Sequence, residues 1–144
     1  MAEQDGLTSK LIHTARLCRS LRSSFLQKHG LYAGQDMLLQ QLARFDGQSM
    51  GALAQALDVR PPTVTKMVAR MQAQGLVRRE PSQYDNRQNH VHITQAGESL
   101  LERIEAAWRD TEECAFAGLK EKDFKRLNKI LGKIKTNLDA GADA

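Results

Sequence analysis

MGALAQALDVRPPTVTKMVARMQAQGLVRR, residues 50–79, contains two helical patterns separated by a tight turn. Ser49 precedes the first pattern, about residues 50–57, and its hydroxyl can accept a hydrogen bond from an N–H of the first turn. The second pattern begins after Arg60 with two prolines, which a first turn tolerates because its N–H groups have no intrahelical acceptor. Two helices joined in this way predict a helix-turn-helix.

The second of these helices is expected to have one buried and one exposed side. Apolar residues repeat at helical spacing at Val64, Met67, Val68 and Met71. The opposite side carries Thr63, Thr65, Lys66 and Arg70. Hydroxyl groups and long basic side chains bond phosphate oxygens and base edges, and arginine can pair with guanine through two hydrogen bonds. The polar side is therefore a candidate nucleic-acid contact.

The neighbouring segments extend this pattern into a small domain. A further helix is expected over about residues 35–45, and short strands are expected at 76–79 and 91–94. A long polar loop, residues 80–90, joins the strands. Three helices followed by a two-stranded ribbon are the order of a winged helix-turn-helix, in which the third helix enters the major groove of DNA and the loop forms a wing. The predicted fold class is mainly α.

Matching apolar seams run along the first and last predicted helices, about residues 7–29 and 120–138. The seams repeat every 3.5 residues and include Leu7, Leu11, Leu21, Leu127, Leu131 and Ile134. The winged part has no sheet face left for two such seams, so they predict dimerisation. We expect an N-terminal dimerisation helix (1–31), a winged domain (32–95) and C-terminal dimerisation helices (96–144) within one integrated domain.

One more long helix is expected between the wing and the last helix. Thr94 is a suitable cap for a helix from about Gln95 to Ala117, and Gly118 is expected to end it. Its apolar side includes Trp108 and Cys114, which we expect to be buried.

The net charge of the 144-residue chain is concentrated in one segment. The chain has 21 basic and 17 acidic residues, giving +4. Residues 60–90 hold six basic and two acidic residues, so the rest of the chain, with fifteen of each, is neutral. A local basic excess favours a polyanionic partner such as nucleic acid.

Other classes of protein find little support in the sequence. No apolar run is long enough to span a membrane and the first residues lack the pattern of a signal peptide, so a cytoplasmic location is expected. Nucleotide-binding and hydrolase motifs are missing, which predicts no catalysis and no cofactor. The two histidines of the second strand, His90 and His92, lack the further ligands of a zinc site, so no metal is expected.

Three segments resemble the MarR family of bacterial transcriptional regulators. They are GLYAGQDMLLQQL (30–42), the quoted stretch from residue 50 and DNRQNHVHITQAG (85–97), in the family's order and spacing. The resemblance implies a homodimer with interlocking terminal helices, which binds a pseudo-palindromic operator on double-stranded DNA. It also implies repression that ends when a small effector binds.

The family's wing motif, an acid followed by arginines, corresponds to Asp85, Asn86 and Arg87, with asparagine where a first arginine is common. Wing contacts with DNA are therefore expected from Arg87 and, more weakly, Asn86. Asp85 is expected to support the wing by pairing with Arg79 or Arg87.

The chain also departs from the family at the start of the third helix. Arg60 stands where a small capping hydroxyl is common, and Pro61 and Pro62 remove two N–H groups. Arg60 is therefore free to contact a backbone phosphate, and we count Arg60 and Pro61 among the DNA-binding residues.

Several residues allow other interpretations. His13, Arg16, Tyr32 and Trp108 are candidates for a pocket that binds a small aromatic or anionic effector. Cys18 has arginines nearby that favour a thiolate, which leaves a thiol-based redox sensor as an alternative to a buried thiol on the seam. A winged-helix module that binds protein and has no catalytic activity is the other alternative.

Overall fold

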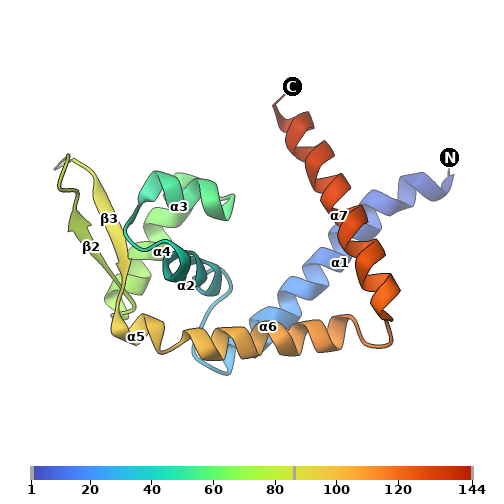
Figure 1. The fold of residues 1–144 in the computed structure, drawn as a ribbon, viewed down its shortest axis with the longest axis horizontal. Helices are drawn as coiled ribbons and strands as arrows, with labels where there is room; N and C mark the ends of the chain where they lie inside the picture. Colours follow the sequence, from blue (N-terminus) through green and yellow to red (C-terminus); the bar gives the residue numbers. More distant parts are fainter. Residues whose placement is uncertain (1, 86, 144) are drawn as a thin grey trace. The chain divides into compact units, whose positions relative to one another are not determined.

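The computed structural model describes residues 2–85 and 87–143, and the chain forms two compact units, Met1–Thr111 and Glu112–Ala144. The elements in chain order are α1 (Ala2–Gln27), α2 (Gln35–Arg44), β1 (Gln48–Ser49), α3 (Met50–Leu57), α4 (Pro61–Ala73), β2 (Val77–Pro81), β3 (Asn89–Ile93), α5 (Gln95–Glu98), α6 (Leu101–Ala115) and α7 (Glu121–Ala142) (Figure 1). The structure is mainly helical with a small sheet, which confirms the predicted winged helix fold.

The core of the first unit is formed by apolar side chains from the helices and the sheet. Fully buried members are Leu38, Leu39, Leu42, Leu53, Val64, Val68, Met71, Val91 and Ile104. α4 buries the side that carries Val64, Val68 and Met71 and leaves Thr63, Lys66 and Arg70 exposed, as its sequence pattern predicts. Ser49 caps α3, because its Oγ accepts a hydrogen bond from the Ala52 N–H at 3.1 Å.

The sheet has three antiparallel strands in the order β1-β3-β2, whereas the sequence predicted two. β2 and β3 pair from Val77 opposite Ile93 to Pro81 opposite Asn89. β1 adds a third strand, with Gln48 opposite Val91. A strand of two polar residues has no detectable alternation, so the prediction missed it.

The single helix predicted from Gln95 is divided into α5 and α6, with a turn at Ser99 and Leu100. Thr94 caps α5 as predicted, accepting a hydrogen bond from the Gly97 N–H at 3.1 Å. Gly97 packs against the strand side of the core: a Cβ at this position would lie 2.3 Å from the carbonyl oxygen of Leu76. This close backbone approach fixes α5, and the turn redirects the chain so that Ile104 enters the core.

We expect Gly97→Ala to lower the free energy of unfolding by about 1–3 kcal/mol, because the added methyl group forces backbone atoms apart. Gly51→Ala in α3 is the matched control. A Cβ there meets nothing within 4 Å, so this variant should be neutral or up to about 1 kcal/mol more stable. Chemical denaturation of both variants measures the difference, and equal stabilities would show that the Leu76 contact is not tight.

A buried polar network joins α1, α2 and α6 within the first unit. Asp36, in the first turn of α2, is fully buried. Its Oδ2 accepts a hydrogen bond from Trp108 Nε1 at 2.9 Å and lies 3.3 Å from Arg22 Nε, while Oδ1 accepts from the Gly34 N–H at 2.9 Å. The guanidinium of Arg22 also lies over the Trp108 ring, 4.7 Å from its centroid. These contacts hold α1 and α6 to the start of α2.

The second unit contains the end of α6 and the whole of α7. Gly118, with φ +82°, ends the helical chain before α7, and the Lys120 N–H donates to Asp123 Oδ2 at 2.9 Å to cap the new helix. Phe116 and Phe124 pack edge to face with their centroids 5.7 Å apart. Cys114 is exposed in this unit, so the prediction that it is buried was wrong.

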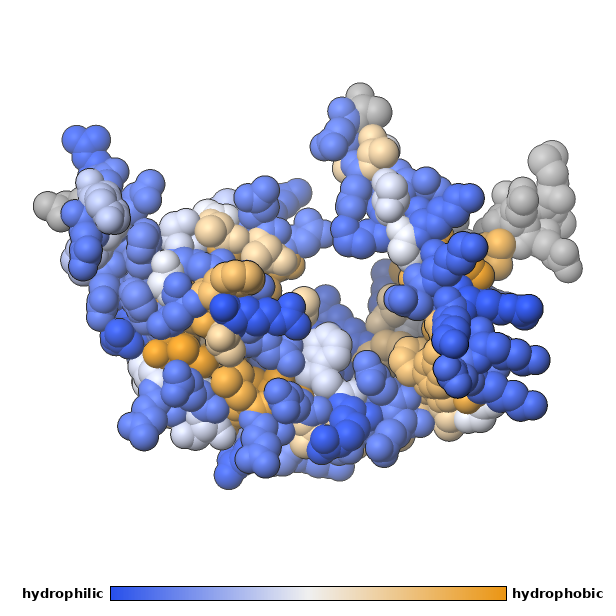
Figure 2. Space-filling model, in the orientation of Figure 1, coloured by the Kyte–Doolittle hydropathy of each residue, from blue (hydrophilic) through white to orange (hydrophobic). Residues whose placement is uncertain are grey.

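Apolar side chains are left exposed on α7 and on α1. None of the described residues of α7 is buried, and its exposed apolar members are Phe124, Ile130, Leu131 and Leu138. On α1 the exposed apolar residues are Leu7, Leu11, Ile12 and Leu17. Apolar residues appear in orange on both helices in Figure 2. Among the described residues, no helix is long and apolar enough to cross a membrane.

Candidate nucleic-acid interface

The start of α4 presents Arg60 without using its side chain as a cap. The Arg60 carbonyl accepts hydrogen bonds from the N–H groups of Thr63 and Val64, at 2.9 and 3.3 Å, and Pro61 and Pro62 have no N–H to satisfy. The first turn is therefore complete without a side-chain acceptor. The guanidinium of Arg60 extends from an exposed residue and is available to an external anion.

The exposed face of α4 differs in hydrogen-bonding capacity along its length. Thr65 Oγ1 donates to the Pro61 carbonyl at 3.0 Å, so its hydroxyl proton is used within the helix. Thr63, one turn before Met67, carries an exposed hydroxyl on the same face as Lys66 and Arg70. Thr63 is therefore the better hydrogen-bond donor to a ligand, although the sequence did not distinguish the two threonines.

Four basic side chains of this region are free of acidic neighbours. Within residues 2–85 and 87–143, no carboxylate lies within 4.0 Å of the cationic groups of Arg60, Lys66, Arg70 and Arg87. All four residues are exposed. Because phosphate binding requires cations that are not already neutralised, these four can contribute fully to the attraction of a polyanion.

Two other arginines of the basic segment are engaged within the protein. Arg78 Nε donates to Glu80 Oε1 at 2.8 Å, and this hydrogen bond holds the pKa of Glu80 below its usual value. Arg79 Nε donates to Gln72 Oε1 at 2.7 Å, which ties β2 to the last turns of α4. Arg79 thus supports the wing through an amide, whereas the sequence suggested Asp85 as its partner.

The wing loop is ordered mainly by its own backbone. Asp85 Oδ1 accepts a hydrogen bond from the Arg87 N–H at 2.9 Å, and this bond takes the place of the ion pair with Arg79 or Arg87 that the sequence predicts. Ser82 is buried, and its N–H donates to the Gln88 carbonyl at 2.8 Å. The short side chain of an aspartate readily reaches the backbone N–H two residues further on, which favours this local hydrogen bond of Asp85. Asn86, also a predicted contact, lies outside the described residues.

The tip of the wing carries an aromatic residue that the sequence analysis missed. Tyr84 is 96% exposed and directly precedes Asp85, which accepts the hydrogen bond from the Arg87 N–H. The visible face of the β2–β3 hairpin is mostly hydrophilic (Figure 2). The sequence signal that could have identified Tyr84 is a tyrosine within the polar loop of residues 80–90.

A second feature missed from the sequence fixes the base of the wing. His92 lies half-buried between two carboxylates, with Nδ1 3.3 Å from Asp46 Oδ2 and Nε2 3.6 Å from Glu80 Oε2. Asp46 Oδ1 also accepts a hydrogen bond from the Ile93 N–H at 2.8 Å. These contacts attach the wing strands to the turn between α2 and β1. Among the described residues, no group of three or more side chains could hold a metal ion.

Tyr32 lies beside α4, in a cavity of about 190 Å³. The cavity is lined by Tyr32, Ala33, Gln35, Thr63, Lys66, Met67 and Arg70. The side chain that was expected in an effector pocket thus adjoins the exposed face of α4, next to two of the free cations.

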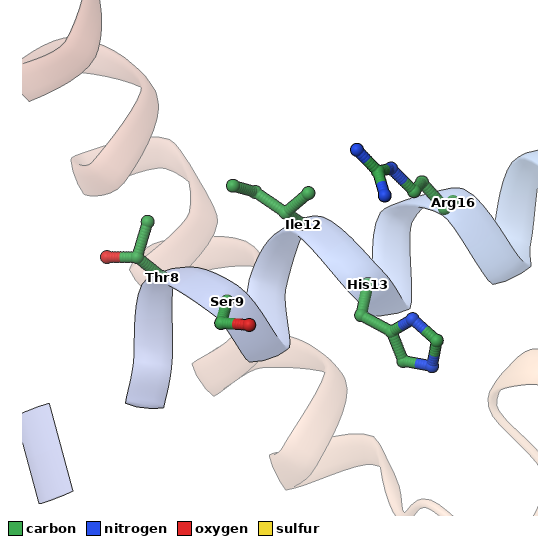
Figure 3. Close-up of a pocket in the computed structure, with 5 residues that line it drawn as sticks. All are labelled: Thr8, Ser9, Ile12, His13 and Arg16. Atoms are coloured by element: carbon green, nitrogen blue, oxygen red, sulfur yellow. The ribbon is translucent and has the colours of Figure 1, made fainter. Parts of the chain in front are cut away.

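The other candidate effector residues do not share this cavity. His13 and Arg16 line an open groove along α1 together with Thr8, Ser9 and Ile12 (Figure 3). Trp108 is half-buried, and its Nε1–H donates a hydrogen bond to Asp36. The structure therefore places the four residues at three positions: His13 with Arg16 along α1, Tyr32 beside α4, and Trp108 at Asp36.

Comparison with known proteins supports this description. Residues 29–88 match the model of the MarR family. The chain is 39% identical over 77 residues to the HTH-type transcriptional repressor IacR of Pseudomonas putida, a match that covers 54% of this chain and 46% of that protein. The chain thus spans about half the length of the curated relatives it matches.

Solved structures match along almost the whole chain. AbsC, a MarR family transcriptional regulator from Streptomyces coelicolor, is 25% identical with a TM-score of 0.83, over 96% of this chain and 95% of its own. A mutant of MarR from E. coli, solved in complex with operator DNA, is 23% identical with a TM-score of 0.81, over 88% of this chain and 91% of its own.

The matched region contains α2, α3, α4 and the wing up to residue 88. It includes Arg60, Lys66, Arg70 and Arg87, the four free cations. Residues 29–88 of this chain are therefore similar to the MarR family of transcriptional regulators.

Proposed function

We propose that this protein binds double-stranded DNA as a homodimer and represses transcription from a pseudo-palindromic operator until a small effector releases it. The observation that carries the proposal is the set of four free cations, Arg60, Lys66, Arg70 and Arg87, on the exposed face of α4 and on the wing. In a winged helix-turn-helix these two elements face the duplex.

We assign different roles to the two elements. Lys66 and Arg70 lie one turn apart on α4 and can enter the major groove, where Arg70 can form two hydrogen bonds with a guanine. Arg87 extends from the wing, where it can enter the minor groove or contact phosphates. Arg60 and Thr63, at the start of α4, can contact the phosphate backbone of DNA. Pro61 lies between them in the first turn and belongs to the same contact surface. The E. coli relative solved with operator DNA supports DNA as the partner.

The exposed apolar seam supports a homodimer. α7 has no buried residue among those described, and Leu131 is 43% exposed in the single chain. Apolar side chains repeated along a helix are rarely left in water, and a two-fold dimer would cover them while presenting both α4 helices to one face of the duplex. Leu7, Leu11, Leu21, Leu127 and Ile134 are the other seam residues that we assign to the dimer.

A regulatory effector has support of a different kind. The relative in Pseudomonas putida is named a repressor, which is consistent with a regulated operator. On this chain the groove along α1 offers His13 and Arg16, and their side chains suit an anionic ligand (Figure 3).

We expect Arg70→Ala and Arg87→Ala to weaken DNA binding in different ways. Arg70→Ala should cost about 1–3 kcal/mol on an operator and relax the preference at one base pair per half-site, because it removes a base contact. Arg87→Ala should weaken all duplexes more evenly and reduce the salt slope by about one unit per protomer, because it removes a charge. Titrations against a duplex selected by the wild-type protein from a random pool, and against its scrambled version, measure both.

Arg109→Ala is the matched control, since it removes an exposed arginine from α6, outside the proposed interface. It should bind both duplexes like the wild type. If Arg70→Ala keeps the full preference for the selected duplex, α4 is not the base-contacting helix in the way proposed.

A further inference from the structure

Arg70 has an aromatic neighbour on a different element. Its guanidinium carbon lies 6.0 Å from the centroid of the Tyr32 ring, within the range of a cation–π contact. Both side chains line the cavity beside α4, and Tyr32 is 53% exposed. The ring is therefore close enough to restrict a long, exposed arginine without removing it from solvent.

The loop that carries Tyr32 is tied to α4 by hydrogen bonds. The Tyr32 N–H donates to Gln35 Oε1 at 3.2 Å, and the Gln35 N–H donates back to the Tyr32 carbonyl at 3.1 Å. Gln35 is buried, and its Nε2 donates to Oε1 of Gln74, the C-cap of α4, at 3.0 Å. The backbone of Tyr32 is thus connected through one buried side chain to the helix that carries Arg70.

Close packing of the same loop on α4 limits its movement further. Gly34 has φ +103°, which side-chain-bearing residues rarely adopt. A Cβ at Gly34 would lie 3.1 Å from Met67 Cε, so the loop backbone rests directly on α4. Together with the hydrogen bonds of Gln35, this contact holds the backbone that places the Tyr32 ring next to Arg70.

We propose that Tyr32 is a positioning residue for DNA recognition: its ring orients the Arg70 guanidinium before DNA binds. The inference rests on the proposed function, in which Arg70 contacts bases. Pairing with guanine through two hydrogen bonds requires a defined orientation of the planar guanidinium. A ring that restricts the side chain in advance reduces the conformational entropy lost on binding. Tyr32 therefore raises sequence preference through Arg70 and not through a contact of its own with DNA.

A double-mutant cycle tests this coupling. The variants are Tyr32→Leu, Tyr32→Phe, Arg70→Ala and the double variant of Tyr32→Leu with Arg70→Ala. The readout is the affinity for the duplex selected by the wild-type protein divided by the affinity for the scrambled duplex. We expect Tyr32→Leu to lower this ratio about 2–5-fold per half-site, as the loss of an exposed cation–π contact predicts. Tyr32→Phe should keep the ratio, because it keeps the ring.

In the Arg70→Ala background, Tyr32→Leu should leave the ratio unchanged. An equal decrease in both backgrounds would show that Tyr32 contacts DNA itself, and this would overturn the proposal. An unchanged ratio in Tyr32→Leu alone would overturn it as well. A merely structural role of Tyr32 would lower the affinity for both duplexes together and leave their ratio unchanged, and this result would overturn the proposal.

The contact has a second readout that does not depend on DNA. The Nε–Hε NMR signal of Arg70 should show a ring-current shift in the wild type and in Tyr32→Phe, and should lose it in Tyr32→Leu. The same signal position in all three proteins would overturn the inference. If the wild type does not bind duplex DNA at all, the proposed function fails, and the NMR shift still tests whether Tyr32 orients Arg70.

Discussion

Asp36→Ala is expected to lose about 3–5 kcal/mol of the free energy of unfolding, because it removes one partner of a buried ion pair. Asp36 is 0% exposed and accepts hydrogen bonds from Trp108 Nε1 and from the Gly34 N–H, beside Arg22. Alanine leaves these donors and a nearly buried guanidinium without the carboxylate, and the N–H groups lose their acceptor in a site that water reaches poorly. The Arg22 side chain is only 15% exposed, so solvent compensates little of its charge.

Urea denaturation at one fixed protein concentration measures this loss. Asp110→Ala is the control: Asp110 lies on the exposed side of α6, in the same unit, and its removal should change the free energy of unfolding by less than about 0.5 kcal/mol. A loss below about 1 kcal/mol in Asp36→Ala would contradict the network's role in joining α1 and α6 to the start of α2.

Leu131→Asp should convert the proposed dimer into a monomer or unfold it, and should weaken operator binding by about 100-fold or more. Leu131 lies in the centre of the α7 seam and is 43% exposed in the single chain. A dimer would bury this position, and a carboxylate buried there would have no partner among the apolar seam residues. Loss of the dimer also removes the linked second half-site contact, which accounts for the large effect on DNA affinity.

Sedimentation together with DNA titration measures both consequences. Lys129→Asp is the control, because it makes a larger charge change on the opposite side of α7. It should remain dimeric and folded. A folded, dimeric Leu131→Asp protein would show that the seam does not form the interface.

The winged fold was predictable because its elements have local signals. Ser49, a residue type that favours helix starts, accepts the capping hydrogen bond of α3. The apolar spacing of Val64, Val68 and Met71 matches the buried side of α4. Gly30 follows the end of α1 with φ +75°, the conformation in which a glycine commonly ends a helix. Each of these signals depends on residues within one or two turns of each other.

Features that depend on distant residues were not predictable in this way. β1 exists because Gln48 and Ser49 pair with β3, more than forty residues away in the sequence. In the sequence, Asp36 is an acidic residue of a first helical turn, and nothing nearby indicates its hydrogen bond with Trp108. Gly97 of α5 lies against the backbone of Leu76, which precedes β2. Sequence periodicity contains no information on such contacts.

The candidate interface divides in the same way. The sequence identified Arg60, Lys66, Arg70 and Arg87, but not that Arg78 and Arg79 are held by Glu80 and Gln72. The formal charge of residues 60–90 counts all six basic side chains equally. Hydrogen bonds within the protein decide which of them remain available to bind phosphate.

The salt dependence of duplex binding tests the central claim, that the four free cations bind DNA, most directly. Two protomers, each offering Arg60, Lys66, Arg70 and Arg87, should neutralise about six to eight phosphates. The logarithm of the association constant should therefore fall with the logarithm of the salt concentration with a slope of about −5 to −7. A slope shallower than about −2 would contradict the claim that these cations hold the duplex.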